Sequence, residues 1–142
     1  MVSKSIQGRE QVTEFDPVAF LGEIENAWQH RDGVAAAAGY TEDAVLIYGA
    51  NQQRSGDELR AWPQQWFDYA KDLHITKVFR AFTDNCLASE WQSQYTHPVT
   101  GKQIYERGAE FFFLRAGKVY LHHMFEHTWA KGEETKQNWP AI

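Results

Sequence analysis

Two long β-prone runs joined by a short turn constrain the fold of this chain more than any other feature. Residues 104–115 and 118–129 are rich in aromatic and branched side chains, and only Ala116-Gly117 separates them. A two-residue connection predicts an antiparallel hairpin whose register follows from the turn. This register places Arg107 opposite Glu126.

Both faces of this hairpin would mix large apolar side chains with ionisable ones. A sheet with one face in water shows a cleaner alternation of apolar and polar residues. We therefore expect both faces to be covered, with polar groups kept where something is bound or paired.

The composition is typical of a single domain that has a ligand cavity or a subunit interface. It also fits a protein from a reducing compartment. At 142 residues the chain can bury one sizeable core, and its 9 Phe, 6 Tyr and 6 Trp suggest a ligand cavity or a subunit interface. A net charge of -5 without a basic run argues against nucleic acid as a partner. The single cysteine, Cys86, excludes an internal disulfide. No stretch resembles a signal peptide or a membrane span, so we expect a soluble, cytoplasmic protein.

Capping residues and apolar periodicity predict three helices before the long strands. The first begins at Asp16-Pro17, where aspartate can cap the helix and proline fits its first turn. The second covers the alanine run 35–38. The third begins at Ser55, which forms a capping-box pattern with Glu58, and Pro63 should kink this helix or reset its start.

The remaining chain predicts an antiparallel sheet. Besides the hairpin, strands are expected at 44–48, 75–82 and 86–95, with a polar loop at 49–54. The expected domain spans 16–129, between a flexible segment 1–15 and a tail 130–142. This order predicts an α+β fold in which a curved, mostly antiparallel sheet wraps around the N-terminal helices and forms a cone with an internal pocket.

Four short motifs carry a resemblance to a known superfamily. They lie at 40–44 (YTEDA), Ser55-Gly56, 81–85 (AFTDN) and 117–119 (GKV). Together with the order of elements, they resemble the nuclear transport factor 2-like superfamily, in its SnoaL-like and ketosteroid-isomerase-like branch. The segment 81–85 and its strands are most similar to a bacterial SnoaL-like family without an assigned activity. The resemblance implies a pocket inside the cone and a homodimer through the outer sheet face, where our register puts Phe112 and Leu121.

The resemblance does not extend to the catalytic residues of a ketosteroid isomerase. The positions that match its catalytic aspartate, its helix tyrosine and its second acid are Tyr48, Ile24 and Ala109. All three depart from the pattern. We therefore expect a different activity.

The same match indicates which hairpin face is inward. It directs these residues toward the cavity: Arg107, Ala109, Phe111, Phe113, Tyr120, His122, Met124 and Glu126, with Ser89, Trp91, Ser93 and Tyr95 on the neighbouring strand. A slip by one residue would exchange every one of them for its neighbour, and Glu110 and His123 would then be the inward pair.

The candidate catalytic residues follow from this assignment. His122 or Glu126 would be the general base, with Tyr48 and Arg107 holding a developing oxyanion. Candidate substrate contacts are Trp28, Trp66, Trp91, Tyr95, Phe111 and Met124. Each has a structural alternative: a core histidine, an exposed Arg–Glu pair, a packing tyrosine or a wall of aromatic side chains.

Other chemistries have little support in the sequence. Adjacent strand residues point to opposite faces, so His122 and His123 cannot share a metal ion, and we expect no metal. No activated nucleophile is evident, and no cofactor is expected. The leading hypothesis is cofactor-free proton transfer that isomerises, dehydrates or cyclises an aromatic or polyketide-like molecule. The alternative is a module that binds a ligand in the cone or a partner on the outer sheet face.

Overall fold

The computed structural model describes residues 14–134, which form three helices and one six-stranded sheet. In chain order the elements are α2 (Pro17–Gln29), α3 (Gly33–Ala37), β1 (Tyr40–Tyr48), β2 (Gln52–Ser55), α4 (Gly56–Tyr69), β3 (Lys71–Thr83), β4 (Cys86–Thr96), β5 (Gln103–Arg115) and β6 (Lys118–Ala130). The strand order is β2-β1-β6-β5-β4-β3. Most of the segments expected at 1–15 and 130–142 lies outside the described residues.

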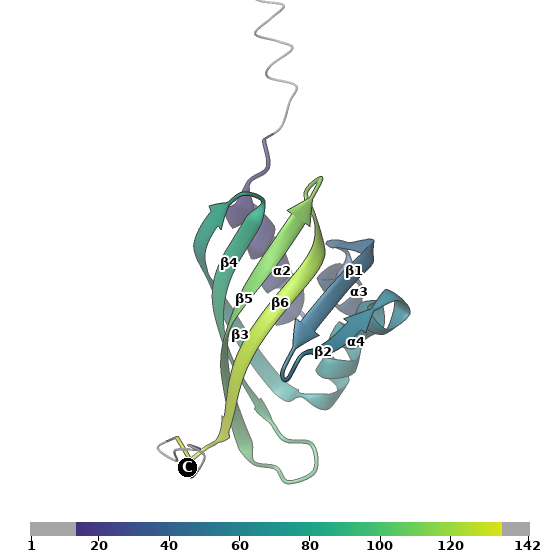
Figure 1. Ribbon diagram of the computed structural model, residues 1–142. Coiled ribbons are helices and arrows are strands. Elements are labelled where there is room, and N and C mark those ends of the chain that lie inside the picture. Colours follow the sequence, from purple (N-terminus) through teal and green to yellow (C-terminus); the bar gives the residue numbers. More distant parts are fainter. Residues whose placement is uncertain (1–13, 135–142) are drawn as a thin grey trace, which may run out of the picture.

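The helices lie together on one side of a curved sheet (Figure 1). Only β1 and β6 pair in parallel, and the other neighbours are antiparallel. The predicted α+β cone is therefore confirmed. The opposite face of the sheet is not covered by any helix of the described chain. No helix within residues 14–134 has the length and apolar character needed to cross a membrane.

Local capping explains where two of the helices begin. The carboxylate of Asp16 accepts a hydrogen bond from the Ala19 N–H at 3.1 Å, and proline occupies the first turn, as predicted. Asp32 caps α3 in the same way, through the Ala35 N–H. The capping box predicted at α4 is wrong, because the side chain of Ser55 makes no capping hydrogen bond.

The β5–β6 hairpin has the predicted turn but a different register. Ala116 and Gly117 have φ values of 51° and 76°, as a type I′ turn requires. After two pairs the register shifts, and Phe113 lies opposite Leu121. Tyr120 is thus the extra residue of a β-bulge. Beyond it every partner is displaced by one residue.

This bulge makes the predicted pairing of Arg107 with Glu126 wrong. Arg107 pairs instead with His127, and Glu126 pairs with Gly108. On β6 beyond the bulge the residues that face the helices are the predicted ones, His122, Met124 and Glu126, whereas on β5 they are those of the alternative register, including Glu110. The following predicted inward residues therefore lie on the outer face: Arg107, Ala109, Phe111, Phe113 and Tyr120.

One strand of the sheet had no clear pattern in the sequence. The short strand β2 occupies the stretch predicted to be a polar loop, and it pairs with β1 at the sheet edge. It places Arg54 opposite Leu46, which in turn lies beside His122 of β6. An edge strand of polar residues lacks the apolar alternation that marks other strands.

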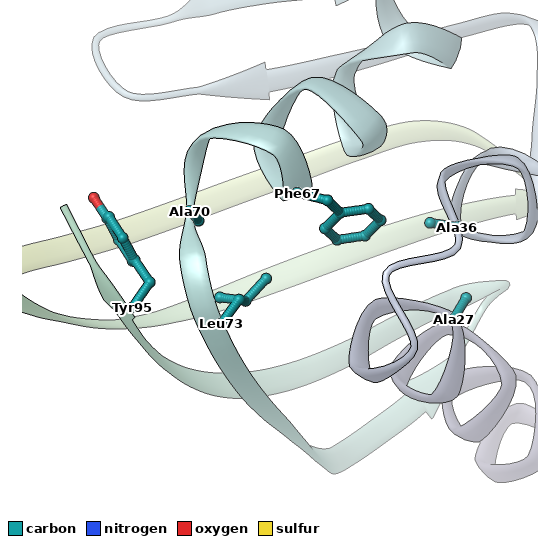
Figure 2. Packing of buried hydrophobic residues seen from close by; sticks show 6 residues of the cluster. All are labelled: Ala27, Ala36, Phe67, Ala70, Leu73 and Tyr95. Carbon is teal, nitrogen blue, oxygen red and sulfur yellow. The ribbon is translucent and has the colours of Figure 1, made fainter. Parts of the chain in front are cut away.

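Small side chains allow the helices to pack closely on the sheet. Ala27 of α2 and Ala36 of α3 are both buried, and Phe67 of α4 points toward them (Figure 2). The ring of Trp28 meets Phe67 edge-on, with centroids 4.9 Å apart. Tyr95 belongs to this same cluster and is 5% exposed.

Gly108 provides the space that Trp91 occupies on the concave face. A Cβ atom at this position would lie 2.5 Å from the carbonyl oxygen of Phe125 and 2.5 Å from Cε2 of Trp91. Both distances are shorter than real contacts allow. The indole therefore lies across the glycine, toward the β6 side of the sheet.

We expect Gly108→Ala to destabilise the protein by about 1–3 kcal/mol, because the added methyl group overpacks a site bounded partly by backbone. The measurement is the free energy of unfolding in urea. The control is Gly22→Ala on the exposed side of α2, where a Cβ meets nothing within 4 Å and should stabilise the helix slightly. Equal stability of the Gly108 variant and the wild type would contradict this account of Trp91.

Candidate functional site

A cavity of about 290 Å³ lies between the helices and the concave face of the sheet. Its apolar wall consists of Ile24, Trp28, Ala36, Trp62, Trp66, Ile75, Trp91, Phe112, Val119 and Met124. Since an apolar cavity of about 150 Å³ already holds benzene, this one has room for a molecule of roughly two rings.

Polar side chains from the sheet and one from α4, Gln65, also reach the cavity. They are Tyr40, Tyr48, Arg54, Gln65, Lys77, Ser93, Glu106, Glu110, His122 and Glu126. All but Gln65 fall into three groups: a buried network around Glu110, two further glutamates with Ser93, and an arginine beside a tyrosine.

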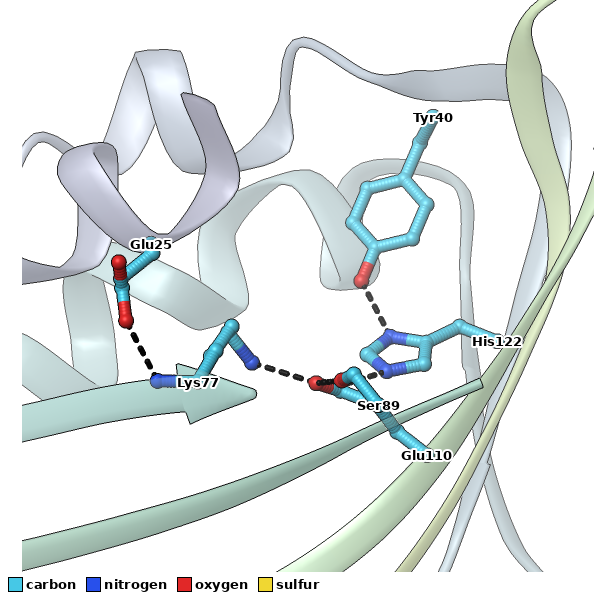
Figure 3. Close-up of polar contacts among 6 residues, drawn as sticks. All are labelled: Glu25, Tyr40, Lys77, Ser89, Glu110 and His122. Carbon is cyan, nitrogen blue, oxygen red and sulfur yellow. Dashed lines mark hydrogen bonds and ion pairs between the residues drawn. The ribbon is translucent and has the colours of Figure 1, made fainter. Parts of the chain in front are cut away.

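The buried network joins five strands (Figure 3). One carboxylate oxygen of Glu110 lies 2.6 Å from Nζ of Lys77 and accepts a hydrogen bond from Ser89 at 2.6 Å. The other lies 2.9 Å from Nε2 of His122. On the far side of the ring, Nδ1 is 2.7 Å from the Tyr40 hydroxyl. The side chains of Lys77, Glu110 and His122 are each at most 5% exposed.

The charges of the network determine its proton positions. Burial alone would raise the pKa of Glu110, but the positive charge of Lys77 and the hydrogen bond from His122 lower it to about 2. An ionised carboxylate can only accept, so Nε2–H of His122 donates to it. Burial lowers the pKa of His122, which favours the neutral ring. Nδ1 then accepts from the Tyr40 hydroxyl, whose pKa is raised by burial and by the charge of Glu110.

Glu106 and Glu126 form a second acidic group at the cavity. Glu106 is buried and accepts hydrogen bonds from Ser93 and Thr128. Burial raises its pKa, and the nearby charge of Glu126 raises it further. No cation within residues 14–134 forms an ion pair with either carboxylate.

Glu126 stands at the edge between the cavity and solvent. Its residue is exposed, yet partial burial of the carboxyl group raises its pKa. Its carboxylate has no hydrogen-bond partner among the described residues. Across the sheet it is followed by Gly108 and then by Trp91. The indole N–H of Trp91 is itself buried without a partner.

Arg54 is the third polar feature. Its guanidinium carbon lies 5.6 Å from the centroid of the Tyr48 ring. Its Nε is buried without a hydrogen-bond partner. Within residues 14–134 the side chain takes part in no ion pair.

The structure brings most, but not all, of the residues selected from the sequence to the cavity. Lining residues are His122, Glu126, Tyr48, Trp28, Trp66, Trp91 and Met124. Arg107 and Phe111 lie on the outer face, and Tyr95 packs in the core against Trp66 and Tyr69. Burial, helped by the charge of Glu106, raises the pKa of Tyr95 to about 12.

Several cavity residues were missed for identifiable reasons. Glu110 was considered only in the alternative register, because the bulge at Tyr120 leaves no mark in the sequence. Lys77 could have been found, since it continues the inward alternation of Leu73 and Ile75 along β3. Arg54 had no such signal. The described residues contain no group of three or more His, Cys, Asp or Glu arranged for a metal ion.

The comparisons with known proteins define the class. The SnoaL-like domain family model matches residues 23–122, and the chain belongs to this family. No curated protein matches the sequence significantly. Fold-level likeness to solved structures is extensive at low sequence identity.

Three solved structures illustrate this likeness. The epoxide hydrolase/cyclase-like enzyme SalBIII, from pyran ring formation in the polyether salinomycin, has 16% identity and a TM-score of 0.67, with 80% of this chain and 95% of that chain covered. A Catenulispora acidiphila protein with a ketosteroid isomerase-like fold, in complex with trimethylamine, has 11% identity and a TM-score of 0.66, with 74% and 82% covered. An LEH-like epoxide hydrolase from M. tuberculosis has 10% identity and a TM-score of 0.62, with 78% and 82% covered. At these identities the comparison establishes the fold alone.

We expect Glu110→Gln to cost about 3–5 kcal/mol of stability, because it leaves Lys77 buried without its counter-charge. Glu90→Gln is the matched control, since it breaks an exposed pair between Glu90 of β4 and Arg80 of β3 and should cost at most about 1 kcal/mol. Chemical denaturation measures both.

The pH dependence gives a second measurement on the same variant. The pKa of Glu110 is lowered from 4.5 to about 2, so its ionised form contributes stability that is complete above pH 4.5 and is lost as the pH falls toward 2. The stability difference between wild type and Glu110→Gln should shrink over this window. A difference that stays constant between pH 5 and pH 2 would contradict the ionised state of Glu110.

Proposed function

We propose that this protein is a small-molecule enzyme that catalyses cofactor-free proton transfer on a ligand held in the cone. The reaction would isomerise, dehydrate or cyclise the ligand. The observation that carries the proposal is Glu126, a carboxylate at the cavity with a raised pKa and no partner among the described residues. A base of this kind is poised to take a proton and later return it.

Glu126 has a hydrogen-bond donor close to it in the sheet. Gly108 separates it from Trp91, whose indole lies across the glycine and whose N–H has no partner. A ligand carbonyl could accept from this N–H while Glu126 removes a proton from the adjacent carbon. The Tyr48 hydroxyl is a second candidate donor at the cavity. Donors directed at a developing oxyanion stabilise an enolate-like transition state.

The structure favours Glu126 over His122 as the base. Both ring nitrogens of His122 are already engaged, one with Glu110 and one with Tyr40. We infer that His122 orients the Tyr40 hydroxyl rather than taking a proton from the ligand. Glu106, with its raised pKa, is the candidate for the acid that returns a proton to the other end of the ligand.

The relatives support an enzyme of this class without identifying its reaction. Two of the three structures described above are named as an epoxide hydrolase or a cyclase-like enzyme. The aromatic wall of the present cavity fits a planar ligand.

We expect Glu126→Gln to lower turnover by about 10²-fold or more while ligand binding is retained, because the amide cannot accept a proton. The assay is deuterium incorporation from D2O next to the carbonyl of two-ring cyclic ketones, with and without a ring carboxylate, followed by NMR. The wild-type rate should rise with pH through a pKa above 4.5, and this rise should be absent in the variant.

Glu90→Gln, an exposed carboxylate on the outer face of β4, is the control and should exchange like the wild type. A Glu126→Gln variant with full activity would remove Glu126 as the base and return the role to His122. Binding without exchange in the wild type would instead make the protein a ligand-binding module.

We also propose that the outer sheet face pairs two copies of the chain. Phe125 is 51% exposed there and meets Phe111 edge-on, with centroids 6.3 Å apart. No described helix covers this face (Figure 1). The sequence-based expectation that Phe112 lies on it is wrong, since Phe112 is 2% exposed and lines the cavity, whereas Leu121 pairs with outward Phe113.

Phe125→Lys should convert the dimer to a monomer, because a lysine charge buried in this apolar interface would have no counter-charge. Val99→Lys, at an exposed apolar residue in the β4–β5 connection, is the control and should stay dimeric. Analytical ultracentrifugation measures the mass. A wild-type monomer at all accessible concentrations would contradict the proposal.

A further inference from the structure

Arg54 differs from the other cation of the cavity in having no counter-charge. Lys77 is neutralised by Glu110 at 2.6 Å. The side chain of Arg54 forms no ion pair or hydrogen bond with any residue between 14 and 134, although it lines the same cavity. Its Nε is buried without a partner, while the residue as a whole is half-buried. A buried, unsatisfied donor on a charged group is costly, which makes it a notable exception.

The position of Arg54 is held by the sheet and by an aromatic ring. Its strand pairs it with Leu46, which is fully buried. Its guanidinium lies beside the ring of Tyr48, which also lines the cavity. An arginine on an aromatic face keeps its planar N–H groups available at the edge. The side chain is therefore positioned to donate hydrogen bonds to an oxyanion that binds in the cavity.

The negative charges of the cavity leave room for such a ligand. Glu110 is already compensated by Lys77. Arg54, Leu46 and His122 lie side by side across strands β2, β1 and β6. Glu126 is four residues beyond His122 on β6, so it lies roughly 13 Å along the strand from this row. The cavity thus has a cationic end near β2 and an acidic end near Glu106 and Glu126.

We propose that the ligand of this cavity is a planar organic anion whose carboxylate binds Arg54, with its one- or two-ring body against the tryptophan wall. The inference rests on the proposed function, since it names the class of molecule on which the proton transfer would act. A carboxylate matches the guanidinium fork with two parallel hydrogen bonds. A neutral ligand of the same shape would leave the charge of Arg54 without a counter-charge among the described residues.

The orientation of the ligand follows from the two ends of the cavity. With its carboxylate at Arg54, the far edge of the ring system points toward Glu126 and the Trp91 N–H. The anchor and the reacting carbon are then separate parts of the ligand. Binding energy at Arg54 would position the proton that Glu126 removes.

The experiment compares 2-naphthoate with 2-naphthamide, which has the same shape and no charge, by isothermal titration calorimetry. The wild type should bind the carboxylate about 10- to 100-fold more tightly, the range that a charge-assisted hydrogen bond supplies. Arg54→Gln should remove this preference and leave the affinity for the amide unchanged. Arg54→Lys, which keeps the charge and lacks the planar fork, should retain part of it.

Arg60→Gln is the matched control, because Arg60 is an exposed arginine on α4 that pairs with Asp57 outside the cavity. It should bind both probes like the wild type. Unfolding curves establish that each variant is folded. The inference is overturned if 2-naphthoate does not bind, if it binds no more tightly than the amide, or if Arg54→Gln weakens both probes equally.

The two proposals fail in different ways. Loss of the charge preference together with exchange that still depends on Glu126 overturns the anion inference alone. A charge preference that depends on Arg54, without any exchange, overturns the enzyme proposal and leaves an anion-binding module.

Discussion

The buried carboxylate of Glu110 is the interaction on which the geometry of the cone depends. It is 1% exposed, and it is neutralised or hydrogen-bonded by Lys77 of β3, Ser89 of β4 and His122 of β6. A buried carboxylate without such partners is disfavoured by several kcal/mol. Since the partners come from three other strands, a slip of any one of them would leave charge uncompensated. We infer that Glu110 specifies the register of the sheet as much as it stabilises it.

The polar groups of the cavity therefore divide into satisfied and unsatisfied ones. In the network around Glu110 each donor has an acceptor, down to the Tyr40 hydroxyl on His122. The indole N–H of Trp91, Nε of Arg54 and the carboxylate of Glu126 have no such partners among the described residues. A saturated network positions the walls, whereas unsatisfied groups are available to a ligand. This division directs the proposed chemistry away from His122 and toward Glu126.

Membership of the SnoaL-like family accounts for the cone, and the particular side chains account for the chemistry we propose. Tyr48 and Ile24 stand at the cavity without a carboxyl group, and Ala109 faces outward. The neighbouring Glu110 does face inward, but Lys77 holds it as a compensated anion. Carboxylates without an ion-pair partner between residues 14 and 134 occur instead at Glu106 and Glu126. The same fold thus presents its acids at different positions along the strands.

The sequence by itself determined the features that depend on neighbouring residues. Asp16 and Asp32 cap their helices through local hydrogen bonds, and Ala116-Gly117 adopts the positive φ values of a tight turn. Only the tertiary structure decided that Arg54 rather than Arg107 reaches the cavity. The bulge at Tyr120 reverses the faces of β5 relative to β6, and an edge strand of polar residues carries Arg54 inward. Both outcomes result from the pairing between strands. The energy of this pairing depends on residues that are distant in the sequence, so no single segment of the chain shows a periodic pattern that reveals it.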